Sequence, residues 1–233
     1  MQFFQFYKNF IKMKKLFFSL LLATGLMTVS SAAFAQKDIL NDLPPYKLGL
    51  VAGMNASSFS HDGYDGKFGF HVGINALFDA SELIKDTYVR TELLFQRKGA
   101  RGALLSSASP VVDSDVRFRT CYLELPVHYG YAYALNSDWT LFGETGPYVA
   151  LGLGGRIHGE DGLGNKVSSK FFTNEDVGND DPNNFDLGWG LHLGTIFQQK
   201  HELKIGWDWG FINMNDTFEQ NRNFMVSYGF YFQ

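Results

Sequence analysis

Apolar and polar residues alternate without interruption from Lys67 to Phe78. One alternate set is almost wholly apolar and consists of Phe68, Phe70, Val72, Ile74, Ala76 and Phe78. The other set consists of Lys67, Gly69, His71, Gly73, Asn75 and Leu77. A period of two predicts a strand with one apolar face and one polar face. Because several polar positions are glycine, which suits a crowded interior, we expect the polar face to point inward and the apolar face to contact lipid.

Eight segments of the chain show this alternation, and each is predicted to form one strand. They span residues 46–57, 67–78, 87–98, 119–131, 139–153, 185–197, 202–212 and 223–232. Eight is the smallest number of strands in outer-membrane barrels. The predicted fold class is therefore all-β, an eight-stranded antiparallel up-and-down transmembrane β-barrel that covers residues 46–233.

The connections between the predicted strands differ in length in a regular way. Compact connections cover residues 79–86, 134–138 and 198–201, whereas the others cover residues 61–66, 99–117, 154–184 and 213–222. Outer-membrane barrels have short periplasmic turns and longer extracellular loops. We therefore expect both termini in the periplasm.

Aromatic residues at the strand ends provide a second observation on how the predicted barrel lies in the membrane. Barrels carry girdles of aromatic side chains where the wall meets the membrane interfaces. The residues predicted for the periplasmic girdle are Tyr46, Phe78, Tyr129, Tyr131, Trp139, Phe197, Phe230 and Phe232. The alternative is that these rings fill a soluble core.

The N-terminal 35 residues have the features of a secretory signal peptide. Lysines 12, 14 and 15 precede an apolar run over residues 16–29, and Ala33-Phe34-Ala35 is a small-x-small cleavage site. Translation starting at Met13 would leave residues 1–12 as an upstream extension. Residues 36–45 are predicted to be a periplasmic lead that ends in two prolines.

Composition narrows the class of protein further. The chain has 233 residues and a net charge of -4, which gives no reason to expect a nucleic-acid partner. Only 19% of residues are charged, whereas 16% are aromatic and 25 are glycine. Cys121 is the one cysteine, so neither an intrachain disulfide nor a cysteine metal cluster is expected. Export without a disulfide framework fits a bacterial envelope.

Four blocks of the sequence resemble a known family. They are residues 88–99 (YVRTELLFQRKG), 122–129 (YLELPVHY), 146–149 (GPYV) and the closing 222–232. They are similar to the small outer-membrane β-barrels of Bacteroidota that are called porin-family or PorT-like. The resemblance implies an eight-stranded barrel in the outer membrane of a Gram-negative bacterium. Many such barrels end on an aromatic residue that the barrel-assembly machinery reads, whereas this chain ends Phe232-Gln233.

The inward positions of the predicted strands carry many polar side chains, and their positive and negative charges nearly balance. They are Lys67, His71, Arg90, Glu92, Gln96, Lys98, Glu124, His128, Glu144, Asp186, His192, Lys204 and Asp208. An eight-stranded barrel is just wide enough for its own side chains, and buried charges need partners. We predict a polar plug in which Arg90 or Lys204 pairs with glutamates 92, 124 or 144. The alternative is a narrow gated pore or a proton path through the three histidines.

Basic residues gather where the third and fourth predicted strands reach the outside. They are Arg97, Lys98, Arg101, Arg117 and Arg119. Guanidinium groups bind phosphate through two parallel hydrogen bonds. The functional interpretation is contact with lipopolysaccharide phosphates in the outer leaflet, and the alternative is a solvated rim.

Catalytic chemistry is not expected. Ser60 with His61, and Ser168 or Ser169 with His158, lie in or beside outside loops, but no Gly-x-Ser-x-Gly elbow occurs. Such loop residues are usually solvated, so the chain is predicted not to be an enzyme, and no cofactor or metal is predicted.

The long loop of residues 155–184 is rich in acidic residues. Carboxylates at this density could hold a divalent cation, but no EF-hand spacing is present. The residues concerned are Glu175, Asp176, Asp180 and Asp181. A flexible acidic loop is the preferred interpretation.

The leading hypothesis is a non-enzymatic outer-membrane barrel with a filled lumen that works through its outside loops. The expected partners are outer-membrane lipids, lipopolysaccharide and, during biogenesis, the barrel-assembly machinery. Alternatives are a small-solute channel, a lipid-modifying enzyme and a soluble lipocalin-like carrier. A secretion-accessory role is implied only by the PorT-like resemblance.

Overall fold

The fold is seen in a computed structural model that describes residues 46–60, 64–104, 113–160, 166–170, 172, 183–213 and 220–232. The chain divides into two units, residues 1–45 and 46–233, and only the second contains described residues. The predicted signal peptide and lead therefore lie outside the described residues. Among the described residues, no helix is both long enough and apolar enough to cross a membrane.

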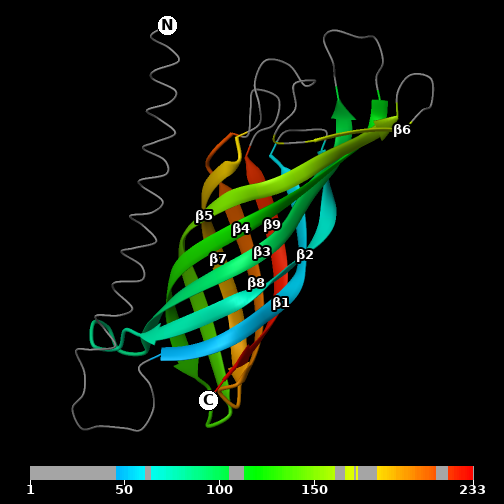
Figure 1. The fold of residues 1–233 in the computed structure, drawn as a ribbon. Coiled ribbons are helices and arrows are strands. Elements are labelled where there is room, and N and C mark those ends of the chain that lie inside the picture. Colours follow the sequence, from blue (N-terminus) through cyan, green and yellow to red (C-terminus); the bar gives the residue numbers. More distant parts are fainter. Residues whose placement is uncertain are drawn as a thin grey trace, which may run out of the picture. The chain divides into compact units, whose positions relative to one another are not determined.

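The described chain is built of β-strands (Figure 1). They are β1 (Tyr46–Phe59), β2 (Tyr64–Asp79), β3 (Thr87–Leu104), β4 (Asp113–Ala134), β5 (Trp139–Glu160), β6 (Lys166–Lys170), β7 (Phe185–Phe197), β8 (His201–Gly210) and β9 (Asn221–Tyr231). Each of the eight predicted strands corresponds to one of these. The structure has one further described strand, the short β6, which pairs with the end of β5.

The eight long strands close on themselves. Each pairs antiparallel with the next along the chain, β5 with β7 across the short β6, and β1 pairs with β9 to complete the circle. The start of β1 lies beside the end of β9, because Gly49 stands opposite Tyr231. The structure thus confirms the predicted all-β, closed, eight-stranded antiparallel barrel, which leaves no open sheet edge among the eight strands.

Three strands extend well beyond their predicted ends. Residues 99–104 and 113–117, expected in one loop, extend β3 and β4, and residues 154–160, expected in another, extend β5. In Figure 1 these strands rise well past the ends of their neighbours. Exposed positions of the extensions include Arg101, Arg117 and Arg156, so the apolar alternation stops where the strands continue.

The wall of the barrel has its apolar face outside. Large apolar side chains at alternate positions are exposed, among them Leu50, Ile74, Leu191, Ile205 and Val226. Charged and amide side chains at the intervening positions are buried. A water-soluble barrel would show the reverse, so this outer face is the one that lipid covers.

Aromatic side chains meet at the end of the barrel where β1 begins and β9 ends. The rings of Tyr46 and Phe78 lie 6.3 Å apart, and those of Trp139 and Phe197 lie 4.7 Å apart. Phe230 and Phe232 are 6.0 Å apart at the end of β9. These contacts place pairs of the predicted girdle residues side by side at this end.

The lipid-facing wall generates a stability prediction. Leu191 lies at the middle of β7 and is 48% exposed, so Leu191→Arg should cost about 2–4 kcal/mol of unfolding free energy in phospholipid bilayers. Leu83, 81% exposed in the turn between β2 and β3, is the matched control, and Leu83→Arg should cost about 0–1 kcal/mol. Equal costs for the two arginines, measured by urea titration, would contradict the assignment of the wall to lipid.

Candidate functional site

The barrel interior is the first candidate site, and the alternation of the strands builds it. Every second residue of the eight strands points inward, which brings together side chains that are distant in the sequence. The buried ionisable residues are His71, Arg90, Glu92, Lys98, Glu124, His128, Glu144, Asp186, His192, Glu202, Lys204 and Asp208. Each is at most 2% exposed.

Arg90 on β3 is the most connected of these charges. Its Nε donates to Glu144 Oε2 at 2.7 Å, and its Nη1 donates to Glu202 Oε1 at 2.9 Å and to the Tyr231 hydroxyl at 2.7 Å. The guanidinium also lies 5.0 Å from the centre of the Phe142 ring. One cation therefore ties β3 to β5, β8 and β9 across the barrel.

Two lysines make further pairs. Lys204 donates to both oxygens of Glu92, at 2.8 and 2.9 Å. Lys98 lies 2.7 Å from Glu124 Oε2, and Gln96 donates to the other oxygen of that carboxylate at 2.8 Å. A buried charge is tolerated when it is paired and hydrogen-bonded, and these residues meet that condition.

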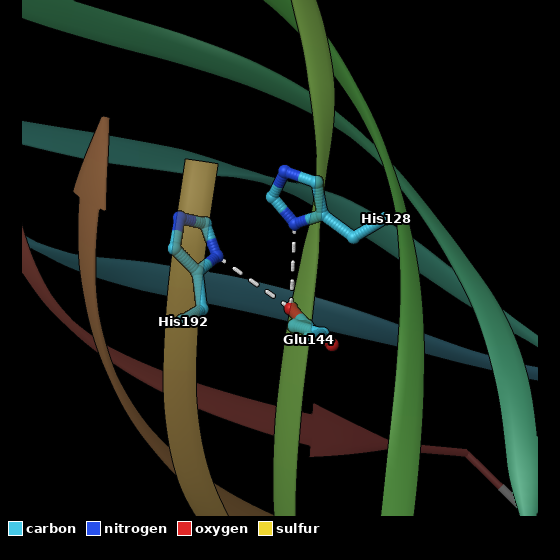
Figure 2. A group of neighbouring side chains, drawn as sticks. All are labelled: His128, Glu144 and His192. Carbon is cyan, nitrogen blue, oxygen red and sulfur yellow. Dashed lines mark ion pairs between the residues drawn. The ribbon is translucent and has the colours of Figure 1, made fainter. Parts of the chain in front are cut away.

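His128 on β4, Glu144 on β5 and His192 on β7 form a compact group next to Arg90. Figure 2 shows both rings turned toward one oxygen of the carboxylate. His128 Nδ1 lies 3.6 Å and His192 Nδ1 3.5 Å from Glu144 Oε1. The opposite nitrogen of His192, Nε2, is 2.9 Å from Asp208 Oδ1. The other lumen histidine, His71, instead faces the Ser227 hydroxyl at 2.8 Å.

Glycines make room for these two rings. A Cβ on Gly206 would lie 2.3 Å from Cδ2 of His192, and a Cβ on Gly190 would lie 2.9 Å from Nε2 of His128. Such contacts are closer than real Cβ atoms tolerate. The glycines noted on the polar face of the alternation therefore serve close packing of the lumen.

The described lumen holds more carboxyl groups than cations, whereas the sequence predicts a near balance of charge. Three cations, Arg90, Lys98 and Lys204, face six carboxyl groups in the described interior. Those six are Glu92, Glu124, Glu144, Asp186, Glu202 and Asp208. The difference arises because Glu202 joins the interior and Lys67 does not.

Lys67 is only half-buried and belongs to the rim of the barrel. Its ammonium is 3.5 Å from the carbonyl of Phe118, and the charges that act on it most strongly are arginines. The register of β2 against β3 shifts between Gly66 and His71. The alternation continues from His71 to Lys67, which stands opposite the buried Ser57 of β1, so Lys67 has the inward direction but lies near the start of β2, at the mouth of the barrel.

The second candidate site is a basic rim near the extended ends of the long strands, defined here as Lys67, Arg97, Arg101, Arg117, Arg119 and Arg156. Arg101 stands opposite Arg117, and Arg119 opposite Arg156. Arg101, Arg117, Arg119 and Arg156 are exposed, and Arg97 is half-buried. Lys98, which was grouped with these residues from the sequence, is 2% exposed and paired with Glu124, so it is part of the lumen.

Sequence reasoning missed residues of the interior. Glu202 was overlooked, although it shares the alternation of Lys204. Asn223 was also missed, and it donates to Gln96 and Asp208, both at 3.3 Å. The period-two pattern would have found both residues, had every inward position been considered.

The serines and histidines considered for catalysis are only partly described. Ser60 bonds to Gln220 at 3.2 Å, whereas His61 lies outside the described residues. His158 stands opposite Ser168 in the pairing of β5 with β6. The charges that act most strongly on His158 are all cations, and a serine triad needs an acid there instead. The acidic residues 175, 176, 180 and 181 also lie outside the described residues.

Comparison with solved structures finds other small barrels. Ail, the attachment invasion locus protein of Yersinia pestis, solved with the heparin analogue sucrose octasulfate, is 14% identical over 80% of this chain and 99% of its own, with a TM-score of 0.41. Neisserial surface protein A is 16% identical over 80% and 96%, with a TM-score of 0.43. OprG of Pseudomonas aeruginosa is 10% identical over 81% and 94%, with a TM-score of 0.39.

The family comparison covers most of the chain. No curated protein sequence matches. Residues 34–216 match the family described as outer membrane protein beta-barrel domain. The chain belongs to this family of outer-membrane β-barrels.

Proposed function

We propose that the protein is a non-enzymatic outer-membrane barrel with a closed interior, which acts through the outside end of its long strands. The observation that carries this proposal is the filling of the lumen by mutually paired charges. The interior of an eight-stranded barrel holds little beyond its own side chains. Ion pairs around Arg90, Lys204 and Lys98 span that interior from wall to wall.

An apolar cluster above the ionic layer supports closure. Phe59, Phe118, Tyr122, Tyr148 and Ile157 are buried together, and the ring of Phe172 packs against that of Tyr122 at 5.9 Å. They lie toward the end of the barrel where β3, β4 and β5 extend. A solute crossing the barrel would have to displace this cluster and then separate the ion pairs beneath it.

The extended strands point to the side of the membrane on which the protein works. Outer-membrane barrels expose their longer connections to the outside of the cell. We therefore place the extended ends of β3, β4 and β5 outside, and the start of β1 and the end of β9 in the periplasm. The aromatic contacts near Tyr46 and Trp139 mark the membrane interface at the opposite end of the barrel.

The basic rim is the surface best suited to a ligand on that side. Its six cations come from four adjacent strands and lie just beyond the apolar wall. Phosphates of lipopolysaccharide would stand at this height in the outer leaflet. Neighbouring arginines can bind such phosphates with paired hydrogen bonds, and this offsets the repulsion among the cations.

The remaining alternatives need features that the described residues do not favour. A channel needs a continuous aqueous path, and a lipid-modifying enzyme needs an acid beside His158. A secretion-accessory role and a PorT-like assignment rest on the sequence resemblance alone. The channel is the alternative that one measurement distinguishes most directly.

The closed interior predicts electrical silence. Purified protein inserted into planar lipid bilayers should give no stable single-channel steps, because the ion pairs and the apolar cluster leave no path. A general porin inserted under the same conditions provides the positive control. Steady steps of constant amplitude from the wild-type chain would contradict closure and favour the channel.

The ionic layer predicts a large cost for losing Arg90. Arg90→Leu leaves Glu144 and Glu202 buried without their cation and should lower the unfolding free energy by about 3–5 kcal/mol. The matched control is Arg222→Leu, at an exposed position of β9, with an expected change within about 0.5 kcal/mol. Adding Glu144→Gln to Arg90→Leu should recover part of the loss. Similar values for the Arg90 and Arg222 variants in urea titrations would be inconsistent with a paired interior.

The basic rim predicts phosphate-dependent lipid binding. Replacement of Arg117, Arg119 and Arg156 by glutamine should weaken lipopolysaccharide binding about tenfold, since each exposed charge contributes up to about 1 kcal/mol. Arg222→Gln, which also removes an exposed arginine from the outer wall, should leave binding unchanged. Binding is measured by titration in detergent with intact and dephosphorylated lipopolysaccharide. The proposal fails if the two lipids bind equally tightly or if the triple variant matches the control.

A further inference from the structure

Three polar atoms in the middle of the barrel face one another without any hydrogen-bond partner. They are His128 Nδ1, His192 Nδ1 and Glu144 Oε1, and all three are buried. They come from β4, β5 and β7, and they all lie within 4.8 Å of one another. Buried polar atoms without partners are costly, and most native ones are satisfied. A group that accepts lone pairs from all three would remove that cost.

The two nitrogen–oxygen distances of the group fit a tetrahedral metal ion. Zinc binds imidazole nitrogen and carboxylate oxygen at about 2.0–2.2 Å, so two of its tetrahedral ligands stand roughly 3.3–3.6 Å apart. The two nitrogen–oxygen distances in the group are 3.5 and 3.6 Å. Hydrogen bonds between these atoms would be shorter.

The surroundings of His192 prepare it to act as a ligand. Its Nε2 lies 2.9 Å from a carboxylate oxygen of Asp208. An imidazole that donates its Nε2 proton to a carboxylate presents the lone pair of Nδ1, and metal-bound histidines almost always have such a partner. In Figure 2 this Nδ1 is the atom directed at Glu144.

Glu144 is likewise held with one oxygen free. Tyr88 and Arg90 both donate to Oε2, at 2.7 Å each, and Oε1 is left facing the two histidines. Lys204 lies 3.9 Å from Oε1, but its own hydrogen bonds go to Glu92. The carboxylate therefore has a fixed orientation before any ion binds.

The charge of the interior favours a cation at this place. The described lumen holds six carboxyl groups and three cations. A divalent ion would offset most of the excess negative charge in a region where unpaired charges are expensive.

We propose that His128, Glu144 and His192 bind a divalent transition-metal ion, with zinc as the best fit to two imidazoles and one carboxylate. The ion joins β4, β5 and β7 inside the barrel, and its role is structural. Because the apolar cluster covers the interior, the ion enters while the barrel folds. This site is independent of the basic rim and of the closure of the lumen.

The test measures metal in the intact chain purified from outer membranes in detergent. Plasma mass spectrometry should find about one zinc ion per chain in the wild type. His71→Gln, which changes the lumen histidine outside the group, should keep that content. His128→Gln combined with His192→Gln should lower it at least tenfold. Circular dichroism checks that each variant keeps its strands.

Cobalt provides a second measurement that needs no variant. The wild-type chain folded from urea with Co²⁺ should show the visible absorption of a tetrahedral Co²⁺ site with nitrogen and oxygen ligands, and an excess of Zn²⁺ during folding should abolish it. Three results would overturn the proposal: no bound zinc in the wild type, equal zinc in the double variant, or no cobalt spectrum. A missing cobalt spectrum would overturn the proposal even if the double variant failed to fold, because that measurement uses the wild-type chain. The three atoms would then form a hydrogen-bonded cluster with a proton or water.

Discussion

The pairing of Arg90 with glutamates from other strands is the interaction on which the interior depends. A closed eight-stranded wall with lipid outside forces the polar half of every strand into a narrow space that water cannot fill. Charges placed there must find partners across the barrel. Arg90 does so with Glu144 on β5 and Glu202 on β8, so the position of each strand fixes the environment of the others.

The interior changes character along the barrel axis. Near the start of β1, rings such as Tyr88, Phe142 and Tyr231 surround the Arg90 cluster. Farther along, Lys98 lies between the rings of Tyr122 and Tyr148, at 5.3 and 5.2 Å. The apolar cluster follows, and the outer surface beyond it is cationic. The interior thus changes from ionic to apolar along the axis, and the exposed arginines lie beyond its apolar end.

The sequence was sufficient for the fold because the wall obeys one simple rule. Apolar and polar residues alternate wherever lipid lies on one side and packed polar groups on the other, so the eight strands and the orientation of Arg90, Glu144 and His192 could be predicted. The apolar alternation is absent from the extensions of β3 to β5, where exposed positions include arginines, so the pattern predicts loops there. Lys67 has the predicted inward direction, but it lies near the start of β2, where its side chain is only half-buried.

The grouping of side chains within the lumen could not be predicted in the same way. His128 and Glu144 become neighbours because Glu144 stands opposite Gly130, two residues along β4 from His128, and His192 joins them because it stands directly opposite Glu144. Periodicity gives the face of a residue but not its height relative to the next strand. The register therefore decides which carboxylate meets which cation.

Glu144 connects the hydrogen bonds of Arg90 with the pair of histidines. Its Oε2 is held by Tyr88 and Arg90, and its Oε1 is directed at the histidines. Buried ion pairs are seldom a gain in stability over apolar packing, and specificity of pairing is their better-attested use. A two-residue slip of β5 would preserve the inward alternation but would carry Glu144 away from Arg90 and from both rings. The ionic interior therefore selects one register among several that the apolar wall alone would allow.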